Sequence, residues 1–218
     1  MTTAVTGERL LVEVWSDISC PWCYLGKHRL ERAIAGSPHA GSIDLAFHSF
    51  ELDPTASAEP RPLLEMLAAT MGVSPAQAAE MDDRVGGMAR AEGLPYTSER
   101  VVANSFDLHR VVHLADAAGQ GGALLTVLYR DLFGGTANVY DHGYLADTAA
   151  GLGIRRERVV EVLAGDEFAE DVRRDVATAA RLGVRGVPFA VLGGRFGIPG
   201  ATSVENYAAG IEQAWGAR

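Results

Sequence analysis

The N-terminal part of the chain pairs two short apolar runs with one amphipathic stretch. Residues Leu10–Trp15 form an apolar run between polar neighbours, which predicts a buried strand. A helix is predicted from Pro21 to about Ala35, because a proline in the first helical turn loses no hydrogen bond. Residues Ile43–Leu52 alternate in part and are rich in strand-forming residues, which predicts a second strand. A strand, a helix and a strand in this order are enough for a parallel βαβ unit.

The pattern changes after this unit. Residues 53–62 contain three prolines and predict a linker. From about residue 63 to residue 182 the apolar positions recur at helical spacing, with glycine-containing breaks between the segments. The predicted helices are Leu63–Met71, Pro75–Glu92, Ser105–Ala118, Gly121–Phe133, Tyr144–Gly151, Arg156–Leu163 and Phe168–Leu182.

Strand character returns near the C-terminus. Residues Pro188–Leu192 and Arg195–Ile198 flank a Gly-Gly pair, which predicts a hairpin, and Ser203–Trp215 form a last amphipathic helix. The order βαβ, helices, ββα predicts a thioredoxin-like α/β fold with a large all-helical insertion. We assign residues 1–53 and 168–218 to the thioredoxin-like domain, and residues 54–167 to the insertion.

Composition and charge narrow the functional classes. The chain has 218 residues, of which 48% are hydrophobic and 22% charged, and this balance is ordinary for a globular protein. Its apolar runs are too short to span a bilayer. The net charge of −9 disfavours nucleic acid and anionic membranes as partners. Residues Met1–Gly7 lack the pattern of a signal peptide, so we expect a cytoplasmic location.

The two cysteines of the chain are three positions apart, in the sequence Cys20-Pro21-Trp22-Cys23. They lie where the first strand is followed by the first helix. Free backbone N–H groups and the helix dipole stabilise a thiolate at such a helix start. Cys23 lies one turn further on the same face, so one thiol can attack a disulfide and the other can resolve the mixed disulfide.

From the residues alone, the cysteine pair also has two alternative interpretations. The cysteines could be half of a zinc site, completed by His109 and His113, which are four residues apart on a predicted helix. The pair could also be incidental. A second feature favours redox chemistry, because Val187-Pro188 directly precedes a predicted strand and an X–Pro bond there is a candidate cis peptide. A trans proline at a sheet edge is the alternative.

With these elements placed, the chain resembles the DsbA-like FrnE family of thioredoxin-fold oxidoreductases. The resemblance rests on EVWSDISCPWCYLGKHRLE (Glu13–Glu31), FELDP (Phe50–Pro54), NSFDLHR (Asn104–Arg110) and GVRGVPFAVLGGRFGIPGA (Gly183–Ala201). It implies a dithiol–disulfide oxidoreductase acting on a thiol or disulfide substrate. It further implies Cys20 as the nucleophile, Cys23 as the resolving thiol and Pro188 as the cis proline. No cofactor is expected beyond the redox-active disulfide, with glutathione as a candidate co-substrate.

The same branch of the fold includes 2-hydroxychromene-2-carboxylate isomerase and kappa-class glutathione transferases, which use a serine near glutathione. A glutathione-dependent isomerase or transferase acting on a small aromatic or polyketide-like compound is therefore an alternative, with Ser19 or Ser16 as the activating hydroxyl. A non-enzymatic redox sensor is a second alternative. Related folds often pair, which favours a homodimer.

The resemblance also assigns the surroundings of the cysteines. Thioredoxin and DsbA carry a buried acid six residues before the first cysteine, where this chain has Val14, so Asp17 is the nearest candidate acid–base. A turn or cap contact is its alternative role. The remaining candidates for substrate binding are Trp22, Val187, Asn104, His109, Gly200, Ala201 and Thr202. We expect His28 and the pair Asp82-Asp83 to lie on solvated helix faces.

Overall fold

The N-terminal βαβ unit forms as predicted. The computed structural model describes residues 9–218. Strand β1 (Leu10–Ser16), helix α1 (Pro21–Gly36) and strand β2 (Ile43–Ser49) follow one another, with a short 3₁₀ turn, η1 (Ala40–Ser42), before β2. Strands β1 and β2 are parallel and in register from Leu10 opposite Ile43 to Ser16 opposite Ser49.

The second strand is shorter than the predicted segment Ile43–Leu52. It ends at Ser49, and Phe50 still donates its backbone N–H to the carbonyl of Ser16. Beyond that point the backbone N–H of Leu52 donates to the carboxylate of Asp17. The chain therefore leaves the sheet because a side chain in the loop after β1 takes the place of a strand partner.

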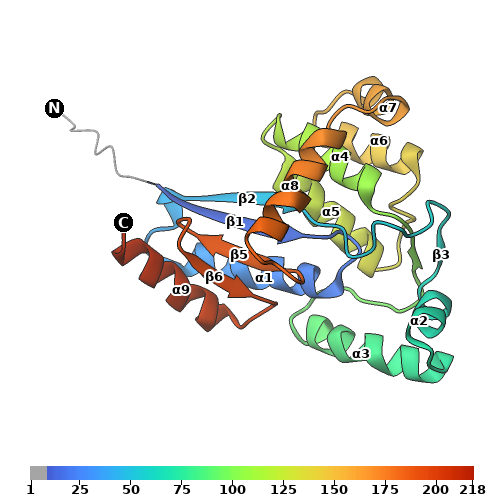
Figure 1. Ribbon diagram of the computed structural model, residues 1–218, viewed down its shortest axis with the longest axis horizontal. Helices are drawn as coiled ribbons and strands as arrows, with labels where there is room; N and C mark the ends of the chain where they lie inside the picture. Colours follow the sequence, from blue (N-terminus) through green and yellow to red (C-terminus); the bar gives the residue numbers. More distant parts are fainter. Residues whose placement is uncertain (1–8) are drawn as a thin grey trace.

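The C-terminal ββα unit completes the sheet. Strand β5 (Phe189–Leu192) runs antiparallel to β1 and to β6 (Phe196–Pro199), and helix α9 (Val204–Gly216) follows. The strand order is β2-β1-β5-β6, so the first and last parts of the chain share one sheet (Figure 1). This order confirms the thioredoxin-like fold that the element pattern predicts.

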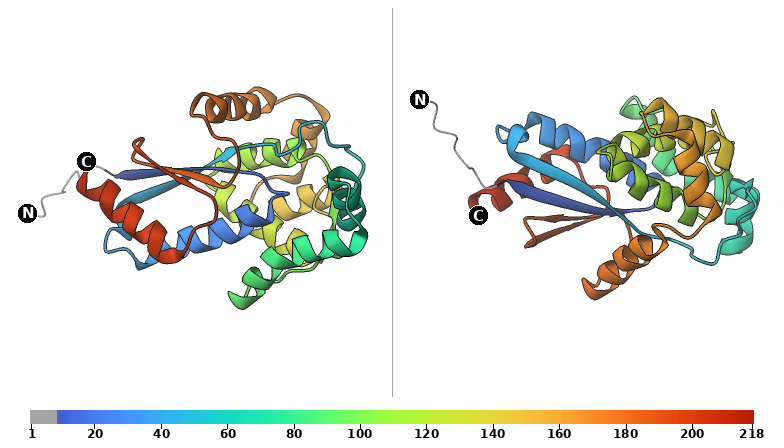
Figure 2. Two further views of the ribbon diagram at one scale, coloured as in Figure 1. Left: turned by 60° about the horizontal axis from the view of Figure 1, so that its bottom comes forward. Right: turned by 90° about the horizontal axis from the view of Figure 1, so that it is seen from above.

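Helices cover both faces of the sheet. Helices α1 and α9 pack together on one face, where Val12 and Val14 of β1 are buried with Leu30 and Ile211. Trp15 points to the opposite face and packs against Ala179 of α8 (Ala169–Arg181). Helix α8 covers this side of the sheet, opposite α1 and α9 (Figure 2). Val14, at the position where the resemblance would place a buried acid, is thus an apolar core residue.

The insertion between the two units is helical. Its helices are α2 (Leu63–Met71), α3 (Pro75–Ala91), α4 (Phe106–Asp116), α5 (Gly121–Phe133), α6 (His142–Gly151) and α7 (Arg156–Ala164). A two-stranded ladder of β3 (Arg61–Pro62) and β4 (Val101–Val102) was not predicted, because two-residue strands leave no periodic pattern. No helix of residues 9–218 combines the length and apolar character needed to cross a bilayer.

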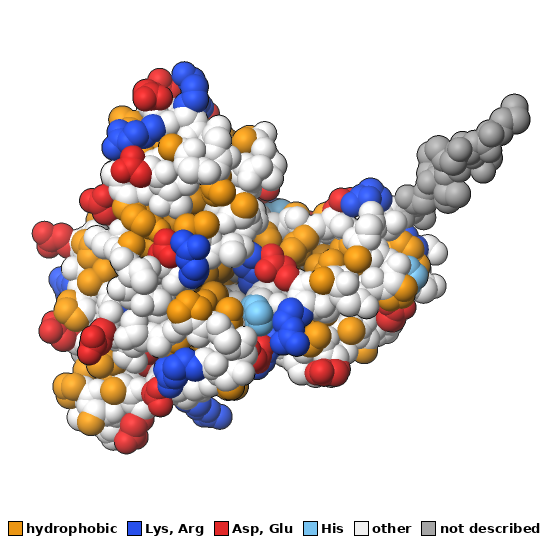
Figure 3. All heavy atoms as spheres, turned by 180° about the vertical axis from the view of Figure 1, so that it is seen from behind, with side chains coloured by type: hydrophobic (Ala, Val, Ile, Leu, Met, Phe, Trp, Pro, Cys, Tyr) orange, Lys and Arg blue, Asp and Glu red, His pale blue; other side chains and the backbone are white. Residues whose placement is uncertain are grey.

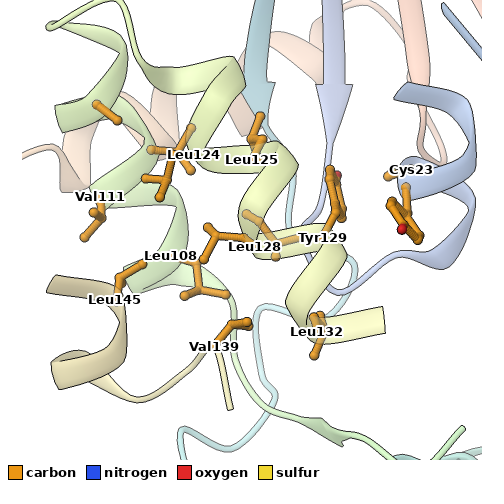
Figure 4. Close-up of a cluster of buried hydrophobic side chains, with 14 of the residues drawn as sticks. Cys23, Leu108, Val111, Leu124, Leu125, Leu128, Tyr129, Leu132, Val139 and Leu145 are labelled. Atoms are coloured by element: carbon orange, nitrogen blue, oxygen red, sulfur yellow. The ribbon is translucent and has the colours of Figure 1, made fainter. Parts of the chain in front are cut away.

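The insertion and the first turn of α1 share one core. Leucines of α4 and α5 form its centre, and Tyr129 lies on the side of this cluster toward Cys23 (Figure 4). The cysteine pair is therefore built against the insertion as well as against the sheet. On the surface seen from behind, acidic and basic side chains are interspersed, and neither forms an extended patch on that face (Figure 3).

Candidate active site

The two cysteines lie on the first turn of α1. Cys20 is the residue before the helix, and its carbonyl accepts the backbone N–H groups of Cys23 at 3.0 Å and Tyr24 at 3.2 Å. Pro21 occupies the first helical position, as predicted. Both cysteines are free thiols and are nearly covered, with 3% and 1% of their surfaces exposed. The helix start thus holds one thiol at its end and the other one turn inside.

The segment before β5 forms the opposite wall of the site. The Val187–Pro188 peptide bond is cis. The Cys20 thiol contacts the carbonyl oxygen of Val187 at 3.7 Å, and the Pro188 carbonyl accepts the backbone N–H of Gly200 at 2.8 Å. Gly26 of α1 makes this approach possible, because a Cβ atom there would lie 2.7 Å from Cγ of Pro188. The structure therefore brings Cys20, Val187 and Pro188 together, as predicted.

The two thiols differ in environment. Burial raises the pKa of Cys23 well above its usual value, and the neighbouring Cys20 raises it further. Cys23 is therefore held as a neutral thiol in the resting protein. Cys20 instead lies at the start of α1, where its thiol faces the carbonyl oxygen of Val187. This asymmetry matches the predicted roles of an attacking and a resolving cysteine.

Asp17 is a buried anion beneath the loop. Its carboxylate accepts the backbone N–H of Ser19 at 3.0 Å and that of Leu52 at 2.8 Å. Burial by itself would raise the pKa of Asp17, but His109, 3.7 Å away, and these two N–H groups outweigh it and hold the pKa below the usual range. The carboxylate is thus engaged in shaping the loop, which is the turn role and not that of a free acid–base.

Two tyrosines near the cysteines were not predicted. The Tyr129 hydroxyl donates to the Asp17 carbonyl at 3.0 Å, and the Tyr140 hydroxyl bonds the Ser19 hydroxyl at 3.0 Å. Burial raises the pKa of both phenols, that of Tyr140 to about 12, so both are neutral. Tyr129 stands at an apolar position of a predicted helix, and no sequence signal separates it from a core residue.

Two residues predicted to bind substrate, Asn104 and His109, instead hold the segment that follows β2. The Asn104 side chain accepts the backbone N–H of Phe106 at 2.9 Å and donates to the carbonyl of Pro54 at 3.4 Å. His109 is 2% exposed, and its Nε2 donates to the Phe50 carbonyl at 3.0 Å. Asn104 therefore joins the linker to the start of α4, and His109 joins α4 to the segment after β2.

The polar groups at the predicted anion site before α9 are already bonded to other parts of the protein. Ser203 caps the helix by accepting the backbone N–H of Asn206, and the Thr202 hydroxyl accepts the Asn206 side chain at 2.8 Å. The Ala201 carbonyl accepts a guanidinium N–H of Arg29 at 2.9 Å. Gly200 and Ala201 do lie beside Pro188 and Gly26, so they contribute shape to the site.

Arg29 is a further residue of the site that no sequence pattern indicated. Its guanidinium pairs with Glu92 at 2.6 Å and so joins α1, the end of α3 and the loop before α9. His28 is half-buried and lies 3.9 Å from Glu92, so it is not the solvated residue that was predicted. Both His28 and Arg29 lie where α3 packs across α1, which removes them from solvent.

The zinc alternative placed two histidines beside the cysteines. The structure engages both elsewhere, since His109 bonds Phe50 and His113 bonds the Ser49 hydroxyl at 3.1 Å and Asp175 at 3.2 Å. Within residues 9–218 no group of three or more His, Cys, Asp or Glu side chains is arranged to hold a metal ion.

A histidine–carboxylate cluster joins the sheet to α8. His48 pairs with Asp175 at 3.1 Å and with Glu13 at 3.2 Å, and it stacks on Trp15. Burial lowers the pKa of His48, but the two carboxylates outweigh it and the pKa lies above the usual value. His48 therefore has a structural role, some distance along the sheet from the thiols.

A cavity of about 620 Å³ lies beside the cysteine loop. Ser19, Pro21 and Trp22 form one wall, and the linker, α2, α3 and β4 form the others. Trp22 is 38% exposed. Asp82 at the cavity wall is 5% exposed and pairs with Arg100 at 2.8 Å, so the expectation of a solvated Asp82 is wrong.

The sheet order, the inserted helices and the dithiol facing a cis proline define a thioredoxin-fold protein of the DsbA type. Comparison with protein families agrees, since the DSBA-like thioredoxin domain matches residues 11–212. The chain belongs to this family. A sequence comparison with curated proteins finds no significant match.

Solved structures support this assignment. A probable DsbA oxidoreductase from Streptomyces coelicolor is 43% identical, with a TM-score of 0.91 over 96% of this chain and 92% of that one. The cytosolic disulfide reductase DsbM from Pseudomonas aeruginosa is 18% identical, with a TM-score of 0.63 over 95% of this chain and 100% of that one. A 2-hydroxychromene-2-carboxylate isomerase, also 18% identical, has a TM-score of 0.67 over 95% of each chain. The last two share the fold.

Proposed function

We propose that this protein is a dithiol–disulfide oxidoreductase in which Cys20 attacks and Cys23 resolves. The observation that carries the proposal is the placement of both thiols on the first turn of α1, with Cys20 facing the carbonyl of Val187 at 3.7 Å. The backbone before Pro188 offers a substrate chain a hydrogen-bonding edge directly beside the attacking sulfur.

The exchange proceeds in two thiol–disulfide exchange steps. The Cys20 thiolate attacks one sulfur of a substrate disulfide, forms a mixed disulfide and releases the other half as a thiolate, which takes up a proton. Cys23 then loses its proton and attacks the Cys20 sulfur, which releases the second half as a thiol. The substrate is reduced by two electrons and the Cys20–Cys23 pair is oxidised to a disulfide. The reverse sequence oxidises a dithiol.

The resting geometry favours this order. Cys23 is 1% exposed and its pKa is raised, so it is a poor first nucleophile. Burial raises the pKa of Tyr129 well above its usual value, so its hydroxyl stays protonated and adds no negative charge to this region. Burial, the neighbouring Cys20 and the negative charge of Asp17 keep Cys23 protonated until a mixed disulfide on Cys20 offers it a target.

Glutathione is the co-substrate that we propose, in a cytoplasmic setting. A structure of the Pseudomonas aeruginosa disulfide reductase DsbM with GSH is among the structural neighbours, and that protein is described as cytosolic. Because the identity to it is 18%, this likeness speaks for the fold, and the use of glutathione rests on the chemistry of the thiol pair. We also propose a homodimer, which sedimentation of the purified protein tests.

The decisive experiment compares two single-thiol variants with the unaltered protein in reduction of insulin by dithiothreitol. Cys20→Ser removes the nucleophile and should abolish the acceleration. Cys23→Ser keeps the nucleophile, so it should accumulate a mixed disulfide whose mass is that of the protein plus one substrate half. Thermal unfolding of each variant checks that the fold is kept.

The same variants separate the alternatives. Turnover of a glutathione-dependent isomerisation or transfer by Cys20→Ser would contradict the dithiol mechanism and support the isomerase or transferase function. A protein whose two redox forms differ in partner binding, while neither form turns over a disulfide, would be a sensor. The oxidoreductase function is refuted if Cys23→Ser traps no mixed disulfide.

A further inference from the structure

The cavity beside the cysteine loop has a composition suited to an apolar ligand. Side chains of α2 and α3 form much of its wall, among them Leu63, Met66, Leu67, Met81 and Val85. Its volume of about 620 Å³ lies within the range of small-molecule sites. The cavity is too well lined with apolar side chains to be a surface irregularity, and its position next to Trp22 connects it to the thiol site.

Large apolar side chains around this cavity are left in the open. Trp22, Leu52 and Met81 line it and are 38%, 51% and 45% exposed. Solvent-exposed apolar groups of this size that converge on one hollow are typical of a binding site. A ligand that covers them gains the free energy of removing their surfaces from water.

The charge of the wall selects against anions. It carries four carboxylates, from Asp17, Asp53, Glu59 and Asp82, and two guanidinium groups, from Arg61 and Arg100. The wall therefore has an excess of two negative charges. Arg100 is already bonded to Asp82, so it offers little attraction to a ligand anion.

One hydroxyl in the cavity wall makes no hydrogen bond to the described part of the chain. Ser105 is 4% exposed and lines the cavity. Its side chain does not cap α4, and within residues 9–218 its hydroxyl makes no hydrogen bond. A ligand with one hydrogen-bonding atom on an otherwise apolar body can bond the Ser105 hydroxyl. A ligand with several charged groups finds no matching charged partners in this wall.

We infer that this cavity holds the uncharged, apolar half of a small-molecule disulfide or thiol while its sulfur reacts at Cys20. The inference rests on the proposed function and extends it to the class of substrate. Ser19 and Pro21, which flank Cys20, belong to the cavity wall, so the cavity borders the loop that carries the attacking cysteine. Cys20 itself is 3% exposed, which favours a small disulfide over a folded protein.

The test uses the Cys23→Ser protein, in which Cys20 is the single thiol. Its second-order rates of reaction are measured with two aromatic disulfides, neutral 4,4'-dithiodipyridine and dianionic 5,5'-dithiobis(2-nitrobenzoate). Each rate is divided by that of 2-mercaptoethanol with the same reagent, which removes differences in intrinsic reactivity. We expect the normalised rate of the neutral reagent to exceed that of the dianion by about tenfold, because both reagents carry an aromatic ring and only the dianion is repelled by the excess negative charge of the wall.

Variants then assign the preference to the cavity. Ala56→Trp fills the cavity from the linker and should lower the neutral reagent's rate by about tenfold, with little effect on the dianion. Ala69→Trp, on an exposed position of α2 outside the cavity wall, is the matched control and should leave both rates unchanged. Met81→Lys adds a positive charge at an exposed wall position and should raise the dianion's rate.

The outcomes separate the two proposals. If Cys20 reacts with both reagents but Ala56→Trp and Met81→Lys match the control, the cavity has no part in substrate choice, and the exchange function stands. If Cys20 reacts with neither reagent, both the exchange function and the substrate assignment are overturned. A selective loss of the neutral reagent's advantage in Ala56→Trp supports the inference.

Discussion

Gly26 is the position where the packing of the site is most easily perturbed. It lies inside α1, and an added Cβ atom would stand 2.7 Å from Cγ and 3.4 Å from Cβ of Pro188. Gly26→Ala therefore has two opposing effects. Alanine favours a helix interior by about 0.5–1 kcal/mol over glycine, while overpacking a fixed neighbour costs about 1–3 kcal/mol.

The rigid neighbour decides the sign. The Pro188 ring cannot rotate away, and its carbonyl is bonded to the backbone of Gly200 at 2.8 Å. We therefore expect Gly26→Ala to lower the free energy of unfolding by about 1 kcal/mol, which is about 2–4 °C in Tm for a chain of this size. The disulfide-exchange rate should fall as well, because the wall opposite Cys20 is displaced.

The same helix provides a matched control. Gly36 ends α1 and has no heavy atom within 4 Å of an added Cβ, so Gly36→Ala should be neutral or slightly stabilising. Urea unfolding of the three proteins and their insulin-reduction rates give both quantities. If Gly26→Ala is as stable and as active as Gly36→Ala, the close approach of α1 to Pro188 is not rigid and the expected cost is wrong.

Three further variants test other parts of the site. The pairing of His48 with Asp175 stabilises the fold only while His48 is charged, and it is lost as the pH rises through its raised folded pKa. The stability difference between the unaltered protein and His48→Asn should therefore shrink from pH 5.5 to pH 8.5. An equal difference at both pH values refutes the pairing. Tyr129→Phe should cost about 1 kcal/mol in urea unfolding, because the Asp17 carbonyl keeps Cys20 as a second donor; no loss contradicts the bond. Arg29→Gln should speed hydrogen exchange of the Ala201 and Thr202 amides, and unchanged rates would show that Arg29 does not hold this loop.

The reacting groups were visible in the sequence because their chemistry is local. Cys20 and Cys23 fall at a strand-to-helix junction, and a proline before a strand has few structural alternatives. Spacing along one helical turn sets their relative positions with no help from the rest of the fold. The order of elements likewise followed from the periodicity of apolar residues, and the structure confirms it.

The second layer of the site could not be predicted in the same way. Asn104 and His109 were expected in the pocket, but Asn104 bonds Pro54 of the linker and His109 bonds Phe50 after β2. Asp82 and Asp83 look alike in the sequence, yet adjacent helical positions point about 100° apart, so one is buried against Arg100 and the other is exposed. The direction of each side chain depends on how a helix packs, which its own residues do not specify.

The sequence alone determined the strand, helix and hairpin order, the spacing of the two thiols and a proline at the start of the third strand, because these depend on neighbours within a few positions. Only the tertiary structure decided that Tyr129 and Tyr140 bond to the cysteine loop, and that Arg29 ties the loop before α9 to α3. It also created the cavity beside Trp22, whose walls come from segments far apart in the chain. Such a hollow exists only after distant helices have packed together.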